Sequence, residues 1–181
     1  MNDFTNIAEY AVTKQRSRLF NVMKYAVPIL FCVFPIIAAL IFGGFGYITS
    51  PIVLVEISIV STIYSAYYFR RIDYDYRMVG SELYFSVIYN RKKRKELGSV
   101  DVSKLEKIAP YTGKYYDEAL SGSYTKVYDF SSAPDAPDVF YGVEKDDESG
   151  EMTMYIFNAS DKMLKLIRTY NRRAIINYPN E

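Results

Sequence analysis

The feature that most constrains this chain is a long run without charge, since no Asp, Glu, Lys or Arg occurs in residues 25–55. A helix needs about 20 mainly apolar residues to cross a membrane, so the run is too long for one straight span. Glycines within residues 43–46 interrupt the run, and Pro51 suits the first turn of a new helix. The pattern predicts two membrane helices, at about residues 25–42 and 51–69, joined by a short extracellular turn.

Basic residues lie on both sides of this apolar region and are missing from the predicted turn. They are Lys14, Arg16, Arg18 and Lys24 before it, and Arg70, Arg71 and Arg77 after it. Because Lys and Arg favour the cytoplasmic side, we expect a multi-pass protein of the cell membrane with both termini in the cytoplasm. The single cysteine, Cys32, excludes a disulfide framework within one chain, as expected in a reducing compartment.

Residues 1–24 precede the first predicted helix and leave two interpretations open. Phe4, Ile7, Ala8 and Ala11 recur at helical spacing, as in an amphipathic segment that lies on the inner surface of a membrane. The amphipathic character is modest, so a loosely ordered tail fits the same residues equally well. In both interpretations this segment lies outside the globular domain.

Residues 72–181 have the pattern of a separate domain built from antiparallel hairpins. Alternating apolar residues give the period of two that is typical of strands, and Gly-rich or polar turns separate them. The expected strands cover residues 72–79, 83–89, 94–102, 105–110, 123–130, 139–144 and 152–157. Residues 112–122 are predicted to be a polar loop.

A C-terminal amphipathic helix is expected after the last strand. Asn158 or Ser160 can cap its start, and apolar residues recur at helical spacing after Asp161. The residues predicted to form much of the domain core are Leu83, Phe85, Val87, Met154, Ile156, Leu164 and Ile167.

Three segments of the chain carry a resemblance to a known family. Residues 76–85 form a strand-turn-strand unit, residues 91–108 a basic hairpin followed by a further strand, and residues 157–164 a last strand and a helix start. This order resembles the pleckstrin-homology (PH) superfold, and more closely the bacterial PH-like domains that follow a two-helix membrane hairpin. The resemblance implies an α+β or mainly β domain: a barrel or sandwich of about seven antiparallel strands capped by one C-terminal helix. It also implies a binding or scaffold module, because these families have no fixed catalytic signature.

The sequence offers few groups for catalysis. It contains no histidine, which removes the commonest general base and metal ligand. The carboxylates of residues 146–151 lack the alternating spacing of a calcium loop and predict a solvated turn. We therefore expect no enzyme activity, no metal and no cofactor. A net charge of +1 gives no general attraction to nucleic acid.

A cluster of cations is the main candidate binding site. Five basic residues follow one another at a predicted hairpin turn: Arg91, Lys92, Lys93, Arg94 and Lys95. Cations held near an anionic leaflet attract its lipids, so membrane lipids are the predicted partner. The alternative is a solvated turn whose lysines prevent pairing between sheet edges.

Glu56 is the second candidate, because it falls inside the second predicted membrane helix. Its side chain can simply reach outward to the polar surface, and we favour that interpretation. Ionisable residues within membrane helices often mark transport pathways. The alternative function is therefore a small oligomeric transport or channel-associated subunit that uses Glu56. A protein partner or a homo-oligomer is also compatible with the sequence.

Overall fold

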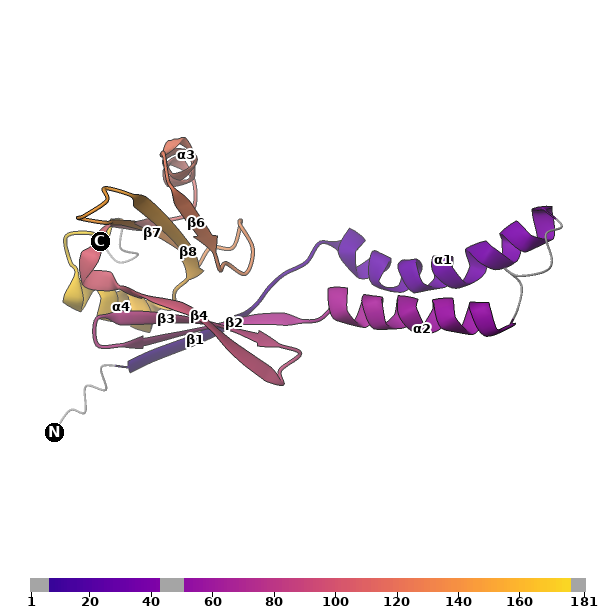
Figure 1. Ribbon diagram of the computed structural model, residues 1–181. Helices are drawn as coiled ribbons and strands as arrows, with labels where there is room; N and C mark the ends of the chain where they lie inside the picture. The colour runs from indigo at the N-terminus through magenta and orange to yellow at the C-terminus, as the bar shows by residue number, and fades with distance from the viewer. Residues whose placement is uncertain (1–6, 43–50, 177–181) are drawn as a thin grey trace. The chain divides into compact units, whose positions relative to one another are not determined.

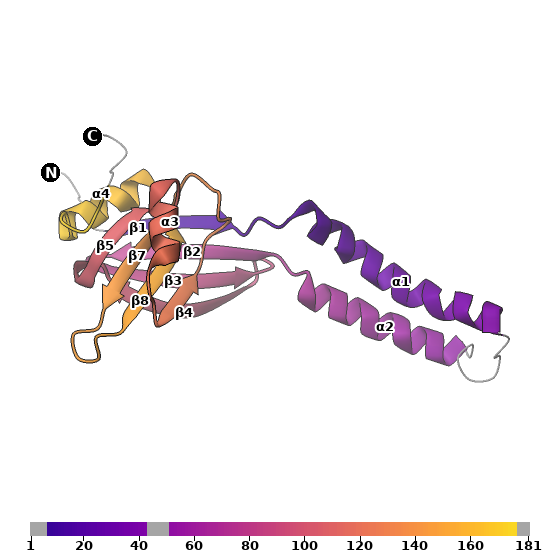
Figure 2. The same cartoon turned by 90° about the horizontal axis from the view of Figure 1, so that it is seen from above.

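The computed structural model describes residues 7–42 and 51–176 and is shown in two views (Figures 1 and 2). Its contacts divide the chain into two compact units. The first, called the sheet unit below, takes in the chain up to Gln15 and again from Arg71 onwards. The second, called the helical pair, is Arg16–Arg70. The predicted extracellular turn lies outside the described residues.

Sheet A of the sheet unit is antiparallel and has the strand order β1-β2-β3-β4. Its strands are β1 (Ile7–Thr13), β2 (Ile72–Val79), β3 (Glu82–Tyr89) and β4 (Lys93–Asp101). A short 3₁₀ turn, η1 (Val102–Lys104), leads from β4 into the second sheet. The three strands predicted for this region, from residue 72 to residue 102, are confirmed to within one residue at each end.

Sheet B has the strand order β5-β7-β8-β6, in which β6 runs parallel to β8 and the other pairs are antiparallel. Its strands are β5 (Leu105–Pro110), β6 (Lys126–Asp129), β7 (Val139–Lys145) and β8 (Met152–Asn158). In Figure 1 the two sheets form separate layers of the sheet unit. The domain is mainly β, but the predicted fold class, a membrane hairpin followed by about seven antiparallel strands and one helix, is wrong. The described residues add β1 to sheet A, form a parallel pair in sheet B and include helices besides the C-terminal one.

The main core lies between the inner faces of the two sheets. On β2 the buried side chains of Tyr74, Tyr76 and Met78 alternate with the exposed Arg77 and Val79, which is the period expected of a strand with one face in water. All seven residues predicted to form the core are buried.

The C-terminal helix α4 (Asp161–Tyr170) completes this core. Its Met163, Leu164 and Ile167 belong to the same apolar cluster as the inner residues of both sheets. The Ser160 hydroxyl accepts a hydrogen bond from the Met163 N–H at 3.4 Å and so caps the helix. The predicted helix and its predicted cap are therefore confirmed.

Strand β1 corrects the interpretation of the N-terminal segment. Neither an amphipathic helix nor a loose tail describes residues 7–13, which pair along their whole length with β2. Ala8 is fully buried, while its neighbours Ile7 and Glu9 are exposed. The few apolar residues of this segment fit the spacing of a helix and also that of a strand. Pairing with the free edge of β2 stabilises the strand. The sheet unit is thus discontinuous in sequence, with the helical pair inserted between β1 and β2.

The helical pair consists of α1 (Arg18–Phe42) and α2 (Pro51–Tyr68). Ser17 caps α1, because its Oγ accepts a hydrogen bond from the Phe20 N–H at 3.3 Å. The two helices contact each other, and the Ser65 hydroxyl donates to the Lys24 carbonyl oxygen at 3.1 Å. The predicted helices are confirmed as helices, although α1 begins well before residue 25.

No helix within residues 7–42 and 51–176 is long and apolar enough to cross a membrane. On this finding the predicted membrane hairpin is wrong, and so is the multi-pass location with two cytoplasmic termini. The uncharged run does not form one apolar element: α1 takes in Arg18 and Lys24, while α2 carries Glu56 and several hydroxyl side chains.

The predicted polar loop at residues 112–122 contains a further helix, α3 (Lys114–Ser121). It buries Ala119 against the outer face of sheet B, in a second apolar cluster with Tyr111 and Tyr141. Gly113 precedes the helix with a φ of 56°, a conformation that favours glycine. A helix of only eight residues gives too short a periodic signal to be recognised from sequence.

Candidate functional site

The turn between β3 and β4 presents the predicted basic cluster. Asn90 and Arg91 both have positive φ, 50° and 58°, and the Lys92 N–H donates to the Tyr89 carbonyl oxygen at 3.0 Å. This is a type I′ turn, whose twist matches that of the strands it joins. The turn is held to the start of β2, because the Arg71 N–H donates to Asn90 Oδ1 at 2.8 Å and the Asn90 N–H donates to the Arg71 carbonyl oxygen at 2.9 Å.

The five cations of this cluster have different surroundings. The Arg94 guanidinium pairs with the Asp75 carboxylate at 3.0 Å across the outer face of sheet A. The strand register places Lys93 and Lys95 on the opposite face of β4 from Arg94. Apart from Arg94, the cations of the cluster form no ion pair with any residue that the structure describes.

Two further cations join the cluster at the same end of sheet A. Lys14 follows β1, and its N–H donates to the Ile72 carbonyl oxygen at 2.9 Å. Arg71 precedes β2 and pairs with Asp73 at 2.8 Å. Burial raises the pKa of Asp73, but hydrogen bonds from Arg71 and Thr13 and the nearby positive charges outweigh burial and lower this pKa below its usual value.

These groups define the basic end of sheet A: Lys14, Arg71 and residues 91–95. It gathers seven cations against three carboxylates, Asp73, Asp75 and Glu96. The sequence identified residues 91–95 but did not bring Lys14 and Arg71 to them. A prediction of an alternating strand at residues 7–13 would have placed Lys14 in the site, because pairing with β2 brings Lys14 beside the turn.

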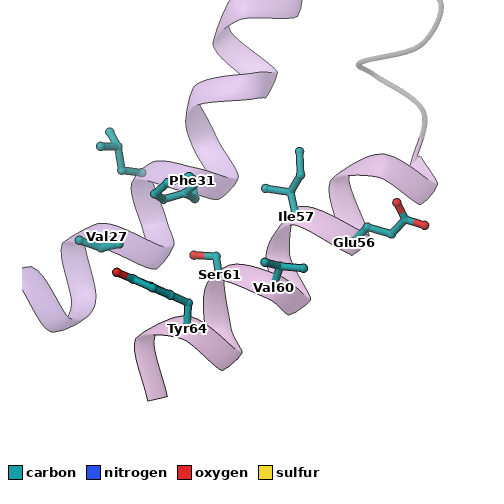
Figure 3. Close-up of a pocket in the computed structure, with 8 residues that line it drawn as sticks. Val27, Phe31, Glu56, Ile57, Val60, Ser61 and Tyr64 are labelled. Atoms are coloured by element: carbon teal, nitrogen blue, oxygen red, sulfur yellow. The ribbon is translucent and has the colours of Figure 1, made fainter. Parts of the chain in front are cut away.

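Glu56 is not part of this site. It lies on α2 in the helical pair, and its side chain is exposed. It lines one end of an apolar groove of about 1110 Å³ between α1 and α2, with Phe31 and Val60 among the other lining residues. In Figure 3 the Glu56 carboxylate points away from α1, whereas Ser61 and Tyr64 point towards it. The transport alternative required Glu56 inside a membrane span, and the finding on the helices removes that basis.

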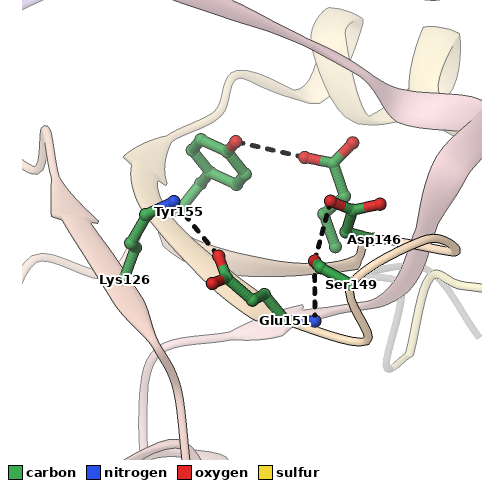
Figure 4. A network of polar contacts seen from close by, with 6 residues as sticks. Lys126, Asp146, Ser149, Glu151 and Tyr155 are labelled. Atoms are coloured by element: carbon green, nitrogen blue, oxygen red, sulfur yellow. Dashed lines mark hydrogen bonds and ion pairs between the residues drawn. The ribbon is translucent and has the colours of Figure 1, made fainter.

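The acidic turn between β7 and β8 is organised by its own side chains (Figure 4). Asp146 accepts a hydrogen bond from the Ser149 hydroxyl at 2.9 Å, which Figure 4 shows. It also accepts one from the Glu148 N–H at 3.0 Å, and these bonds lower the pKa of Asp146. Glu151 pairs with Lys126 at 3.1 Å. The Asp146 carboxylate therefore stabilises the turn, and the Glu151 carboxylate links it to β6. Both roles fit a solvated hairpin turn.

Tyr155 extends this network towards the core. Its hydroxyl donates to Glu144 at 3.1 Å, and burial followed by the charge of Glu144 raises the pKa of Tyr155 to about 12. Its ring stacks on Phe85 with centroids 5.9 Å apart and on Tyr128 at 5.6 Å. The stack connects sheet A to sheet B, so packing between the sheets explains the position and the partial burial of Tyr155.

A comparison with protein-family models identifies the fold. The model of a bacterial PH-like domain (DUF6106) matches residues 6–177. The chain belongs to this PH-like family. The match begins before β1 and continues through the helical pair, so β1 is part of the PH-like domain although the helices separate it from β2. The predicted PH-like resemblance is confirmed; its membrane hairpin is not supported. No curated protein and no solved structure matches the chain.

Proposed function

We propose that this PH-like domain is a non-catalytic binding module whose basic end contacts anionic lipid headgroups. The observation that carries the proposal is the excess of cations at one end of sheet A. Four of them, Arg91, Lys92, Lys93 and Lys95, have no ion-pair partner among the described residues. Cations held on rigid strands and a tight turn can meet a charged surface together, without first being ordered.

The expected strength of this contact follows from the number of free cations. A Lys or Arg near an anionic leaflet contributes about 1 kcal/mol, so four of them contribute at most about 4 kcal/mol. Arg94 adds less, because Asp75 already neutralises it. Screening acts over about 8 Å at physiological ionic strength, so the contact should weaken steeply with added salt.

A structural role for the same lysines is the competing explanation. β4 is an edge strand, and lysines together with a β-bulge protect such edges from pairing with other chains. β4 has both features, because the register with β3 shifts between Phe85 and Ser86. Edge protection predicts aggregation when the lysines are removed, whereas lipid contact predicts loss of vesicle binding by a protein that stays monodisperse.

Vesicle flotation of the full chain tests the proposal. The measured quantity is the difference in binding between vesicles with 30% phosphatidylserine and vesicles of phosphatidylcholine alone, which removes any contribution independent of lipid charge. We expect this difference to fall by about two orders of magnitude in Lys92→Ala/Lys93→Ala/Lys95→Ala, since three cations account for about 3 kcal/mol.

Matched variants separate position from net charge. Lys104→Ala/Lys162→Ala/Lys165→Ala removes three exposed lysines outside the basic end and should leave the difference almost unchanged. Equal losses in the two triple variants would show that only net charge matters and would refute a localised site. Binding that persists in 1 M salt would refute the electrostatic contact.

A further inference from the structure

A buried tyrosine hydroxyl lies beneath α3, far in sequence from the basic cluster. Tyr141 is on β7, and its side chain is fully buried in the second apolar cluster. Its hydroxyl has no hydrogen-bond partner of acceptable geometry among the described residues. Buried hydroxyls normally have a partner, because an unmade hydrogen bond costs more than a made one contributes.

A lysine with a weakly held partner lies beside this hydroxyl. Lys107 is on β5, and its ammonium is 5.7 Å from the centroid of the Tyr141 ring. It pairs with Glu118 of α3. Burial lowers the pKa of Lys107, but the hydrogen bond to Glu118 and the proximity of the Tyr141 oxygen outweigh burial and raise it. The Glu118 side chain is 56% exposed and that of Lys107 is 22% exposed, so Glu118 can turn into water while Lys107 stays in place.

Tyr124 adds a second phenol to the group. Tyr124 packs against the same apolar cluster that contains Tyr141. Burial and the neighbouring Tyr141 raise the pKa of Tyr124. A side chain at Gly122, directly after α3, would collide with the Tyr124 ring. The glycine therefore allows Tyr124 to fold against the end of α3.

We propose that Lys107, Tyr141 and Tyr124 form a binding site for a small carboxylate, and that the Glu118 side chain occupies this site as an internal substitute. A carboxylate has two oxygens and can accept several hydrogen bonds. Glu118 is tied to the α3 backbone and satisfies Lys107 but not the Tyr141 hydroxyl. A free carboxylate has no such tether, so it can accept from the lysine and from a phenol together.

Acetate serves as the probe, and the measurement is thermal unfolding of the full chain. The midpoint in sodium acetate is compared with that in sodium chloride at the same ionic strength and pH 7. A ligand that binds the folded state raises the midpoint in proportion to the logarithm of its concentration above the dissociation constant. We expect acetate to raise the midpoint of the wild type and of Glu118→Gln.

The apparent affinity of Glu118→Gln should be about twofold to fivefold higher, because an exposed ion pair competes only weakly. Lys107→Met should lose the response. Lys126→Met removes the other Lys–Glu pair of sheet B and should keep it. An equal response in all four proteins, or the same shift with sulfate, would overturn the proposal.

Tyr141→Phe gives an independent result. Because the hydroxyl is buried without a partner, its removal should leave the midpoint in chloride unchanged or slightly higher, yet abolish the acetate response. If Tyr141→Phe lowers the midpoint in chloride and keeps the acetate response, the hydroxyl has a structural partner such as a water molecule, and the proposal fails.

Discussion

Asn158 offers the sharpest test of how the sheet unit is held together. It is the last residue of β8 and is fully buried. Its Oδ1 accepts a hydrogen bond from the Ser132 N–H at 2.8 Å, and its Nδ2 donates to the Ser132 hydroxyl at 2.9 Å. The Ser132 carbonyl oxygen in turn accepts from the Gln15 N–H at 2.8 Å. The Asn158 side chain thus connects β8 to the loop before β7, and the backbone of that loop is bonded to the residues that follow β1.

Replacing Asn158 with Ala leaves two buried groups of Ser132 without partners. Each buried unsatisfied group costs about 1–3 kcal/mol, so the free energy of unfolding should fall by about 2–6 kcal/mol. That is a large part of the 5–15 kcal/mol typical of a domain. At roughly 2–4 °C per kcal/mol for a chain of this size, the midpoint should drop by about 10 °C.

The assay is equilibrium urea unfolding followed by circular dichroism, with Lys162→Ala on the exposed face of α4 as the control. A double-mutant cycle with Ser132→Ala should show that the two changes are not additive, since both remove the same bonds. A loss below about 0.5 kcal/mol for Asn158→Ala, equal to that of the control, would mean that the loop supplies other partners, and the reasoning would be refuted.

Two further predictions concern β1 and the basic end. Replacing residues 16–70 by a short Gly-rich linker between Gln15 and Arg71 should leave the sheet unit folded, because Thr13 and Asp73 are paired neighbours. Removing β1 as well should cost at least about 3 kcal/mol, since the partly buried Tyr10 and its hydrogen bond to Asp138 are lost, and equal urea midpoints for the two proteins would contradict this. The lowered pKa of Asp73 means that its ionised form stabilises the fold above a pH of about 4 and that this contribution disappears as the pH falls through the folded-state pKa. Wild type and Asp73→Asn should therefore differ in stability at pH 5–8 and converge towards pH 2, and a difference that stays constant in urea titrations down to pH 2 would be inconsistent with the ion pair.

The successful predictions share one physical basis, which is local periodicity. The alternation through Leu83, Phe85 and Val87 is a property of the strand itself, and Ser160 caps α4 through a residue only three positions away. The type I′ turn at Asn90 and Arg91 is equally local. For this reason the sequence predicted β2 to β5, α4 and the buried residues closely.

The wrong or missing predictions depended on contacts between distant segments. The uncharged run predicted two membrane helices. Hydropathy averaged over that run does not show where each helix begins and ends, or which charged and hydroxyl residues each helix includes. α3 is only eight residues long, and it packs with Tyr111 and Tyr141, which the chain brings together only in the folded sheet.

The sequence by itself determined the strands after residue 71, the capped C-terminal helix, the core and the five-residue basic cluster, because each depends on neighbours within a few positions. Only the tertiary structure decided that residues 7–13 are a strand, since their apolar spacing fits a helix or a strand until β2 offers them an edge. The pairing of β1 with β2 carries Lys14 to the basic turn, and the pairing of β2 with β3 carries Arg71 there. The pairing of β5 with β7 places Lys107 near Tyr141. The residues in each of these groups are far apart in the chain, and only the pairing of strands within each sheet brings them close to one another.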